Sequence, residues 1–114
     1  MYRYSMDKKA DLLPGTLEMM ILHSIKRTPL HGYAIAQRIQ QASGDVLQVG
    51  EGSLYPALQR LLLNGFVEAE WGQSDNRRRV RFYKPTAAGR RQLQVEISEF
   101  DRILSAIAAV MQTG

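Results

Sequence analysis

The stretch that decides the fold is residues 50–66, which read GEGSLYPALQRLLLNGF. Ser53 is a residue type that caps helix N-termini, and Pro56 is tolerated in a first turn, where the amides lack intrahelical acceptors. Asn64-Gly65 is a typical helix stop. The apolar positions recur at helical spacing and form one stripe: Leu54, Ala57, Leu58, Leu61 and Leu62. We therefore predict a helix that starts at Ser53 and buries a leucine-rich side.

The other side of this predicted helix is mostly polar. Pro56, Gln59 and Arg60 lie opposite the leucine stripe, with Tyr55 on the flank. Glutamine can pair with adenine edges and arginine with guanine edges, while Ser53 and the free first-turn amides could hold a phosphate. An ordinary amphipathic helix with a solvated outer side is the alternative. The residues that follow the helix decide between the two.

A basic hairpin is predicted directly after that helix. Residues 66–71 and 77–84 alternate as strands do, and residues 72–76 are rich in turn formers. Residues 72–85 hold five basic side chains and one acidic one, and this balance of +4 equals the net charge of the whole chain. Such a local excess is a footprint for polyanions. The basic residues are Arg77, Arg78, Arg79, Arg81 and Lys84.

The arginines of the hairpin have different expected roles. Alternation sends Arg77, Arg79 and Arg81 to one face of the second strand and Arg78 to the other. Arginines at a hairpin tip suit phosphates or a narrow minor groove. Arg81 could instead pair across the hairpin with Glu68 or Glu70, a structural role that stays open. Trp71 is interpreted as a packing residue of the hairpin.

Two further helices precede this region. Residues 16–27 have apolar side chains almost all round, so the sequence predicts a helix, with Thr16 as a cap, that is buried on two sides. In so small a chain we expect the second side to belong to a partner subunit. A helix over 31–42 follows, with His31 at its start. Its inner side is formed by Ile35, Ile39 and Ala42, and Tyr33 is on its polar side.

A long helix is predicted from Thr86, its cap, to Gln112. Apolar residues step along it by 4, 3, 4, 3 and 4 positions, which is a heptad seam. A seam this short is suited to a helix that packs on its own domain and on a second copy. We therefore assign a homodimer interface to Leu93, Ile97, Phe100, Leu104, Ile107 and Met111.

Three helices, a hairpin and a last long helix define the expected fold class. It is mainly α with a small β-hairpin, a winged helix-turn-helix plus a long C-terminal dimerisation helix. We divide the chain into a flexible N-terminal arm (1–11), the winged helix-turn-helix domain (12–85) and the dimerisation helix (86–114). Double-stranded DNA is the expected partner. The alternative is a protein-interaction module that kept this fold without binding DNA.

Other function classes find little support. The chain has no cysteine and two histidines, so no disulfide framework, metal site or cofactor is expected. No nucleophile–base pair is evident, which argues against an enzyme. No apolar run approaches the ~20 residues of a membrane helix, and the start lacks a secretion signal. We expect a cytoplasmic protein.

Several motifs together resemble those of the PadR-type transcriptional regulators, over about residues 13–95. The matching stretches are Leu30-His31-Gly32-Tyr33, residues 51–58, Leu61, Asn64-Gly65-Phe66, Arg77-Arg78-Arg79, Phe82-Tyr83 and residues 86–93. The chain looks like the short subfamily with a single C-terminal helix. One departure is Pro85, where the family more often has an aliphatic residue.

This resemblance implies a homodimer that binds a palindromic operator, usually as a repressor, and that dimerises through its C-terminal helix with help from the N-terminal one. It implies DNA contact by Ser53, Tyr55 and Pro56, with Gln59 further along the helix, and a backbone contact by Tyr33. A small hydrophobic effector that releases the DNA is compatible with this class. Its pocket could be lined by Met19, Met20, Phe100 and Met111, although plain core packing of these residues is the simpler interpretation.

Overall fold

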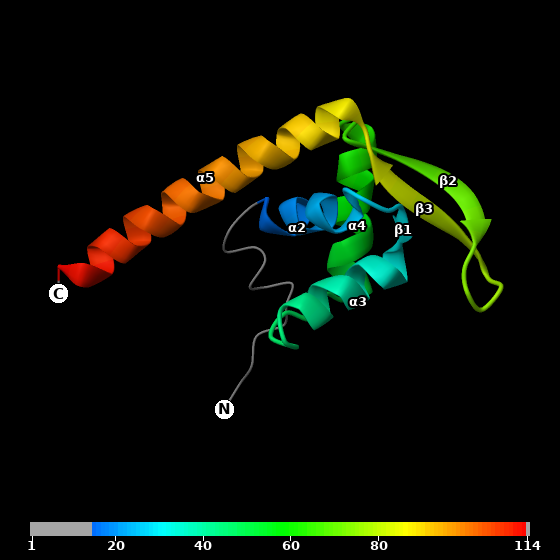
Figure 1. Ribbon diagram of the computed structural model, residues 1–114, viewed down its shortest axis with the longest axis horizontal. Coiled ribbons are helices and arrows are strands. Elements are labelled where there is room, and N and C mark those ends of the chain that lie inside the picture. Colours follow the sequence, from blue (N-terminus) through cyan, green and yellow to red (C-terminus); the bar gives the residue numbers. More distant parts are fainter. Residues whose placement is uncertain (1–14, 114) are drawn as a thin grey trace.

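A computed structural model describes residues 15–113 of the chain (Figure 1). The predicted arm at 1–11 lies outside the described residues. The elements, in chain order, are α2 (Thr16–Ile25), β1 (Leu30–His31), α3 (Gly32–Ala42), α4 (Glu51–Leu63), β2 (Val67–Gln73), β3 (Arg79–Pro85) and α5 (Ala87–Gln112). Four helices with a small antiparallel sheet confirm the expected fold class of a winged helix with a C-terminal helix.

The core forms around α2, which packs against α3, α4, α5 and β3. The core side chains come from all four helices and from two strands: Leu17, Ile21, Leu22, Ile25, Ile35, Ile39, Leu54, Ala57, Leu58, Leu61, Val67, Tyr83 and Leu93. Leu22 is on the second side of α2, which was expected to contact a partner subunit, but it is only 1% exposed in the single chain. Contacts within the single chain therefore explain most of the apolar side chains around α2. Met19 and Met20 are only partly covered. Ala42 was expected in the core but is exposed.

The sheet has three strands in the order β1-β3-β2. Leu30 pairs with Tyr83 and His31 with Phe82, so the hairpin gains a short third strand that the alternation pattern did not predict. A strand of two residues is too short to show a period of two. This short strand positions α3, because its pairing with β3 holds the start of α3 beside the middle of β3.

Helix α4 begins two residues earlier than expected. Its N-cap is Gly50, so Ser53 is the third helical residue and its amide already donates to the Gly50 carbonyl at 3.2 Å. Pro56 consequently lies in the second turn. The capping role of Ser53 is wrong, and the first-turn amides free for an anion belong to residues 51 and 52. The cap assigned to Thr16 is also wrong, because Gly15 holds that position.

The end of α4 and the start of α5 are joined. The Phe66 amide donates to the Leu61 carbonyl at 2.9 Å and Gly65 has a positive φ of 74°, which is a Schellman ending. The Thr86 hydroxyl then donates to the Gly65 carbonyl at 2.7 Å and accepts from the Gly89 amide at 3.0 Å. The predicted Thr86 cap is confirmed. Figure 1 shows α5 and the hairpin running from this junction to opposite sides of the helical body.

The predicted heptad seam divides into two parts along α5. Leu93 is 5% exposed and belongs to the core of its own chain, with Ile97 packed beside it. Phe100 is partly covered. Leu104, Ile107 and Met111 are exposed, Met111 at 74%. An interface role for Leu93 is therefore incompatible with its burial, whereas the second half of the seam has no partner within residues 15–113.

Candidate nucleic-acid interface

The corner between β1 and α3 explains the Leu30-His31-Gly32-Tyr33 motif. Leu30 packs against the core, and the His31 Nδ1 accepts the Ala34 amide at 3.4 Å, which caps α3. The expected role of His31 at the start of this helix is confirmed. The His31 ring also lies edge-on to Phe82 and stacks with Tyr33. Tyr33, 67% exposed, is thereby oriented outward from the first turn of α3.

Gly32 allows α4 to approach this corner. A Cβ at Gly32 would lie 2.8 Å from the hydroxyl oxygen of Tyr55, so a larger residue at this position would displace the Tyr55 ring. Tyr55 remains 47% exposed. Burial raises the pKa of the neighbouring Tyr83, with Tyr55 adding a smaller contribution in the same direction against an opposing one from Arg81. The flank of α4 that carries Tyr55 is thus fixed against the start of α3 and the base of the hairpin.

The hairpin presents a cationic face toward these tyrosines. Trp71 pairs directly with Arg81, and Arg79 is on the same face because strand side chains alternate. The Arg79 guanidinium lies 4.5 Å from the centre of the Trp71 ring, and the Arg81 guanidinium lies 5.9 Å from the rings of both Trp71 and Tyr83. Near its base this same face packs into the core through Tyr83 and Val67.

The two acidic residues of the hairpin strands are on its other face. Glu68 pairs with Lys84 in the strand register, and their charged groups lie 3.8 Å apart. Glu70 pairs with Phe82. Glu68 is opposite Lys84 and Glu70 is opposite Phe82, so both carboxylates are on the other face of the hairpin from Arg81, and the alternative pairing of Arg81 with Glu68 or Glu70 is wrong. The face turned to the helices therefore keeps its positive charge.

The tip of the hairpin is a tight three-residue loop. The Arg77 amide donates to the Ser74 carbonyl, and the Ser74 amide donates to the Arg78 carbonyl, both at 2.9 Å. Arg77 has a φ of 64°, in the left-handed region where glycine is usual. Arg77 and Arg78 both lie before β3, which begins at Arg79, so the alternation expected from Arg77 onward does not hold for these two residues.

A groove of about 630 Å³ lies between the hairpin and the α3–α4 corner. It brings together many of the residues predicted to bind DNA: Tyr33, Tyr55, Arg78 and Arg79, joined by Trp71 and Arg81. Beside this groove, the outer side of α4 carries Pro56 and Gln59, both exposed, while Ser53 is partly covered. Aromatic rings, hydroxyls and guanidinium groups in one groove are suited to a sugar–phosphate strand.

Arg60 is directed elsewhere. Its Nε donates to Glu18 Oε2 of α2 at 2.7 Å, so it lies on the flank of α4 opposite Tyr55. The groove does not include it. Sequence reasoning could not find this pair, because the two residues are 42 positions apart. It also missed the role of Gly32, although a glycine at the first position of a helix was a signal for a close approach.

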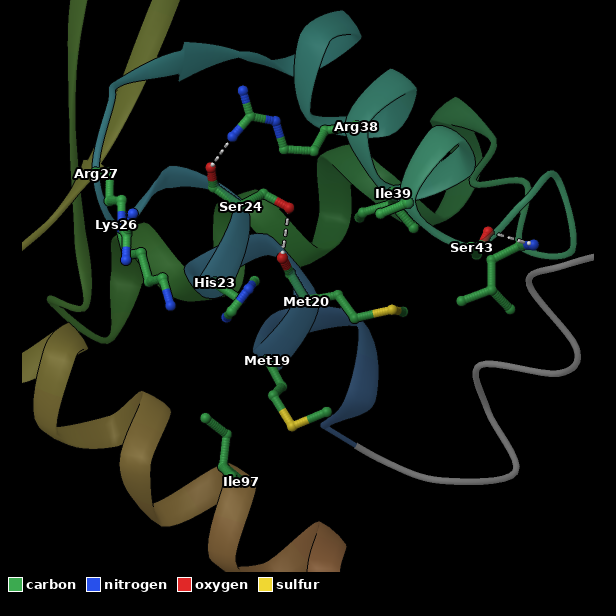
Figure 2. A pocket seen from close by; sticks show the side chains of 12 residues that line it. Met19, Met20, His23, Ser24, Lys26, Arg27, Arg38, Ile39, Ser43 and Ile97 are labelled. Atoms are coloured by element: carbon green, nitrogen blue, oxygen red, sulfur yellow. Dashed lines mark hydrogen bonds between the residues drawn. The ribbon is translucent and has the colours of Figure 1, made fainter.

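A second cleft of about 630 Å³ opens between α2, α3 and α5 (Figure 2). Its apolar lining includes Met19, Met20 and Ile97, and basic groups of Lys26 and Arg38 are at its rim. Arg38 donates to the Ser24 carbonyl at 3.5 Å, and Ser24 donates to the Met20 carbonyl at 2.7 Å. Of the residues suggested for an effector pocket, Met19 and Met20 line this cleft, and Phe100 and Met111 do not.

Two other features are absent from the described residues. Between residues 15 and 113, no three histidine, aspartate or glutamate side chains are grouped so that they could hold a metal ion. No helix in this part of the chain combines the length and apolar character needed to cross a membrane.

The three helices, the wing-like hairpin and the cationic groove define a winged helix-turn-helix protein of the DNA-binding class. Residues 21–95 match the transcriptional regulator PadR-like family. The chain belongs to the PadR-like family of transcriptional regulators, and the resemblance seen in its motifs is confirmed. The family and the structural relatives are transcriptional regulators, not enzymes.

Solved structures share this fold over most of their length. A transcriptional regulator from Clostridium thermocellum aligns with a TM-score of 0.79 and 23% identity, covering 87% of this chain and 96% of that one. A PadR-like regulator from Bacillus cereus aligns with a TM-score of 0.73 and 24% identity over 90% and 97% of the two chains. A PadR family regulator from Eggerthella lenta aligns with a TM-score of 0.77 and 22% identity over 94% and 91%.

Two sequence relatives carry no functional name. An uncharacterized protein X from Lysinibacillus sphaericus is 27% identical over 91% of this chain and 95% of its own length. An uncharacterized 37.1 kDa protein of a Streptomyces fradiae transposon is 37% identical over 75% of this chain. The match spans only 23% of that longer protein.

Proposed function

We propose that this DNA-binding regulator acts as a homodimeric repressor of a palindromic operator. The observation that carries the proposal is the groove that joins Tyr33 and Tyr55 to the arginine-bearing face of the hairpin. One DNA backbone strand follows this groove, and α4 enters the adjacent major groove with Pro56 and Gln59 on its outer side. The repressor role and the palindrome follow from the family resemblance.

A second copy of the chain is the partner that suits the exposed end of α5. Leu104, Ile107 and Met111 are exposed there, and residues 103–114 contain no charged side chain. An uncharged apolar helix end is unfavourable in water, and a twofold pairing of two such ends removes both from solvent. Dimerisation also sets the separation of the two α4 helices, and hence the spacing of the two half-sites.

The cleft of Figure 2 is where we place a small hydrophobic effector. Its volume is in the range of pockets for small molecules, and its residues come from α2, α3 and α5. Since α3 also carries Tyr33, a molecule in the cleft would act on an element that contacts DNA. The volume and the apolar lining of the cleft support this part of the proposal. Calorimetric titration of hydrophobic compounds into the wild-type protein tests it.

Footprinting on the DNA upstream of the chain's own coding sequence tests the operator proposal. The expected result is two protected half-sites whose centres are about 10 base pairs or a multiple apart. Gln59→Ala should weaken binding by roughly 5- to 100-fold, as expected when a hydrogen-bonded base is no longer read. Arg60→Ala is the matched control on the same helix, and it should change affinity by less than about threefold, because Arg60 pairs with Glu18.

Other outcomes would contradict the proposal. If no fragment of this DNA is protected and a stable protein partner is recovered instead, the chain is an interaction module. If Arg60→Ala weakens binding as much as Gln59→Ala, the side of α4 assigned to DNA is wrong.

A further inference from the structure

We infer that Trp71 is a positioning residue for DNA binding: its ring holds Arg79 and Arg81 extended toward the groove with their hydrogen-bond donors free for phosphate. The inference rests on the proposed function. It assigns to Trp71 a role other than packing of the hairpin, the interpretation that its sequence position favoured.

The exposure of Trp71 argues against a packing role. Its side chain is 59% exposed, and it is absent from the hydrophobic core. What it does contact is cationic: Arg79 at 4.5 Å, diagonally across the hairpin, and Arg81 at 5.9 Å, directly opposite. An exposed indole in contact with two guanidinium groups is a platform for cations.

The way these arginines are held matters for binding. Within residues 15–113 the ion pairs are Arg60–Glu18, Lys84–Glu68 and Arg102–Glu99, so neither Arg79 nor Arg81 is neutralised by a carboxylate. A carboxylate would occupy the N–H donors, whereas an aromatic face contacts the flat side of the guanidinium and leaves its edge available. Ordering the side chains before binding also lowers the entropy lost when phosphate is bound.

Residues on the opposite face of the hairpin support the position of Trp71. On the other face, the Phe82 ring lies across Gly72, where a Cβ would stand 2.8 Å from the ring. Phe82 is also in edge contact with His31 of β1. The strand that carries Trp71 is therefore held against β3, and the orientation of the indole follows from that of the sheet.

The stack can be measured without DNA. Trp71 is the only tryptophan of the chain, so its fluorescence reports this position alone. In Arg79→Ala/Arg81→Ala, the quenching constant with acrylamide should rise by about half or more, because both covering groups are removed. The matched control Arg78→Ala, a groove arginine with no contact to the ring, should leave it unchanged. Equal quenching in all three proteins would overturn the inference.

The second arm measures binding of a fluorescein-labelled duplex of mixed sequence by anisotropy. Trp71→Leu should weaken binding by roughly 3- to 30-fold, and Trp71→Phe should restore most of the affinity because a ring remains. In the Arg79→Ala/Arg81→Ala background, Trp71→Leu should have almost no further effect. The salt dependence of Trp71→Leu should stay near wild type, since no charge is removed. Circular dichroism verifies that each variant is folded.

The outcomes separate this inference from the proposed function. If the wild type binds and Trp71→Leu binds equally well, only the role of Trp71 is overturned. It is also overturned if Trp71→Leu weakens binding equally with and without the two arginines, because the ring would then contact DNA or support the fold directly. If the wild type binds no duplex, the proposed function fails with it.

Discussion

Gly89 of α5 lies directly against the carbonyl oxygen of Phe66: a Cβ at Gly89 would stand 1.9 Å from that oxygen. The contact is made where the Thr86 amide donates to the same carbonyl at 3.0 Å. The first turn of α5 is thereby seated on Phe66, the residue just before β2. The direction of the long helix, and with it the placement of the proposed second copy, depends on the absence of a side chain at Gly89.

Gly89→Ala should therefore destabilise the protein despite the better helix propensity of alanine. The oxygen belongs to the backbone and cannot rotate away, so we expect the free energy of unfolding to fall by about 3 kcal/mol. Urea unfolding followed by circular dichroism measures this. Ser105→Ala, on an exposed part of α5, is the control and should change stability by less than about 0.5 kcal/mol. A Gly89→Ala protein as stable as wild type would show that α5 is not seated on Phe66.

Arg77 combines a charge that is proposed to contact DNA with an unfavourable backbone conformation. At a φ of 64° an L-residue is strained by about 1 kcal/mol, and a glycine would relieve this at a similar cost in chain entropy. Arg77→Gly should thus be at least as stable as Arg77→Ala while both bind DNA about equally weakly. Thermal unfolding and anisotropy on the two variants test this. Stronger binding by Arg77→Gly than by wild type would show that the side chain makes no DNA contact.

Tyr83 should make stability depend on alkaline pH. Burial raises the pKa of its hydroxyl above the ordinary value of 10.0, with Arg81 opposing the shift. A folded-state pKa above the unfolded one means that its contribution is complete below pH 10.0 and is lost as the pH rises through the folded value. In urea unfolding from about pH 9 to about pH 11, Tyr83→Phe should lose less stability than wild type. Identical profiles for wild type and Tyr83→Phe would contradict the account.

The exposed part of the α5 seam should control dimerisation. Leu104→Glu/Ile107→Glu places carboxylates where two helices are proposed to meet, so light scattering should give the mass of a monomer with unchanged helicity. Operator affinity should fall as well, because two half-sites no longer act together. Ser105→Glu adds charge on the other side of α5 and should remain dimeric. A monomeric wild-type protein would contradict the proposal that the exposed part of the α5 seam forms a dimer interface.

Local patterns predicted much of this fold. The Thr86 cap and the ending at Asn64-Gly65 were readable because each depends on residues within five positions of one another. The start of α4 was misplaced because its actual cap, Gly50, has no capping side chain, and Ser53 nearby does.

Contacts between residues that are far apart in the sequence were not predictable. The Arg60–Glu18 pair, the contact of Tyr55 with Gly32 and the burial of Leu93 within its own chain each join separate elements. Periodicity placed Arg60 and Leu93 on the correct helix sides but could not show what covers those sides. The structure therefore brings the predicted tyrosines together with Arg78 and Arg79, whereas the sequence did not indicate how these side chains are held.

The most direct test of the central claim is the salt dependence of DNA binding by the dimer. On the DNA upstream of its own coding sequence, contact with ~6–10 phosphates predicts that affinity falls by ~10³–10⁵ between about 50 and 200 mM salt. Arg77→Ala/Arg78→Ala/Arg79→Ala should flatten the slope by roughly one unit for each phosphate that is no longer neutralised. A wild-type affinity that hardly changes with salt, or a slope unaltered in the triple variant, would contradict the assignment of the hairpin to DNA.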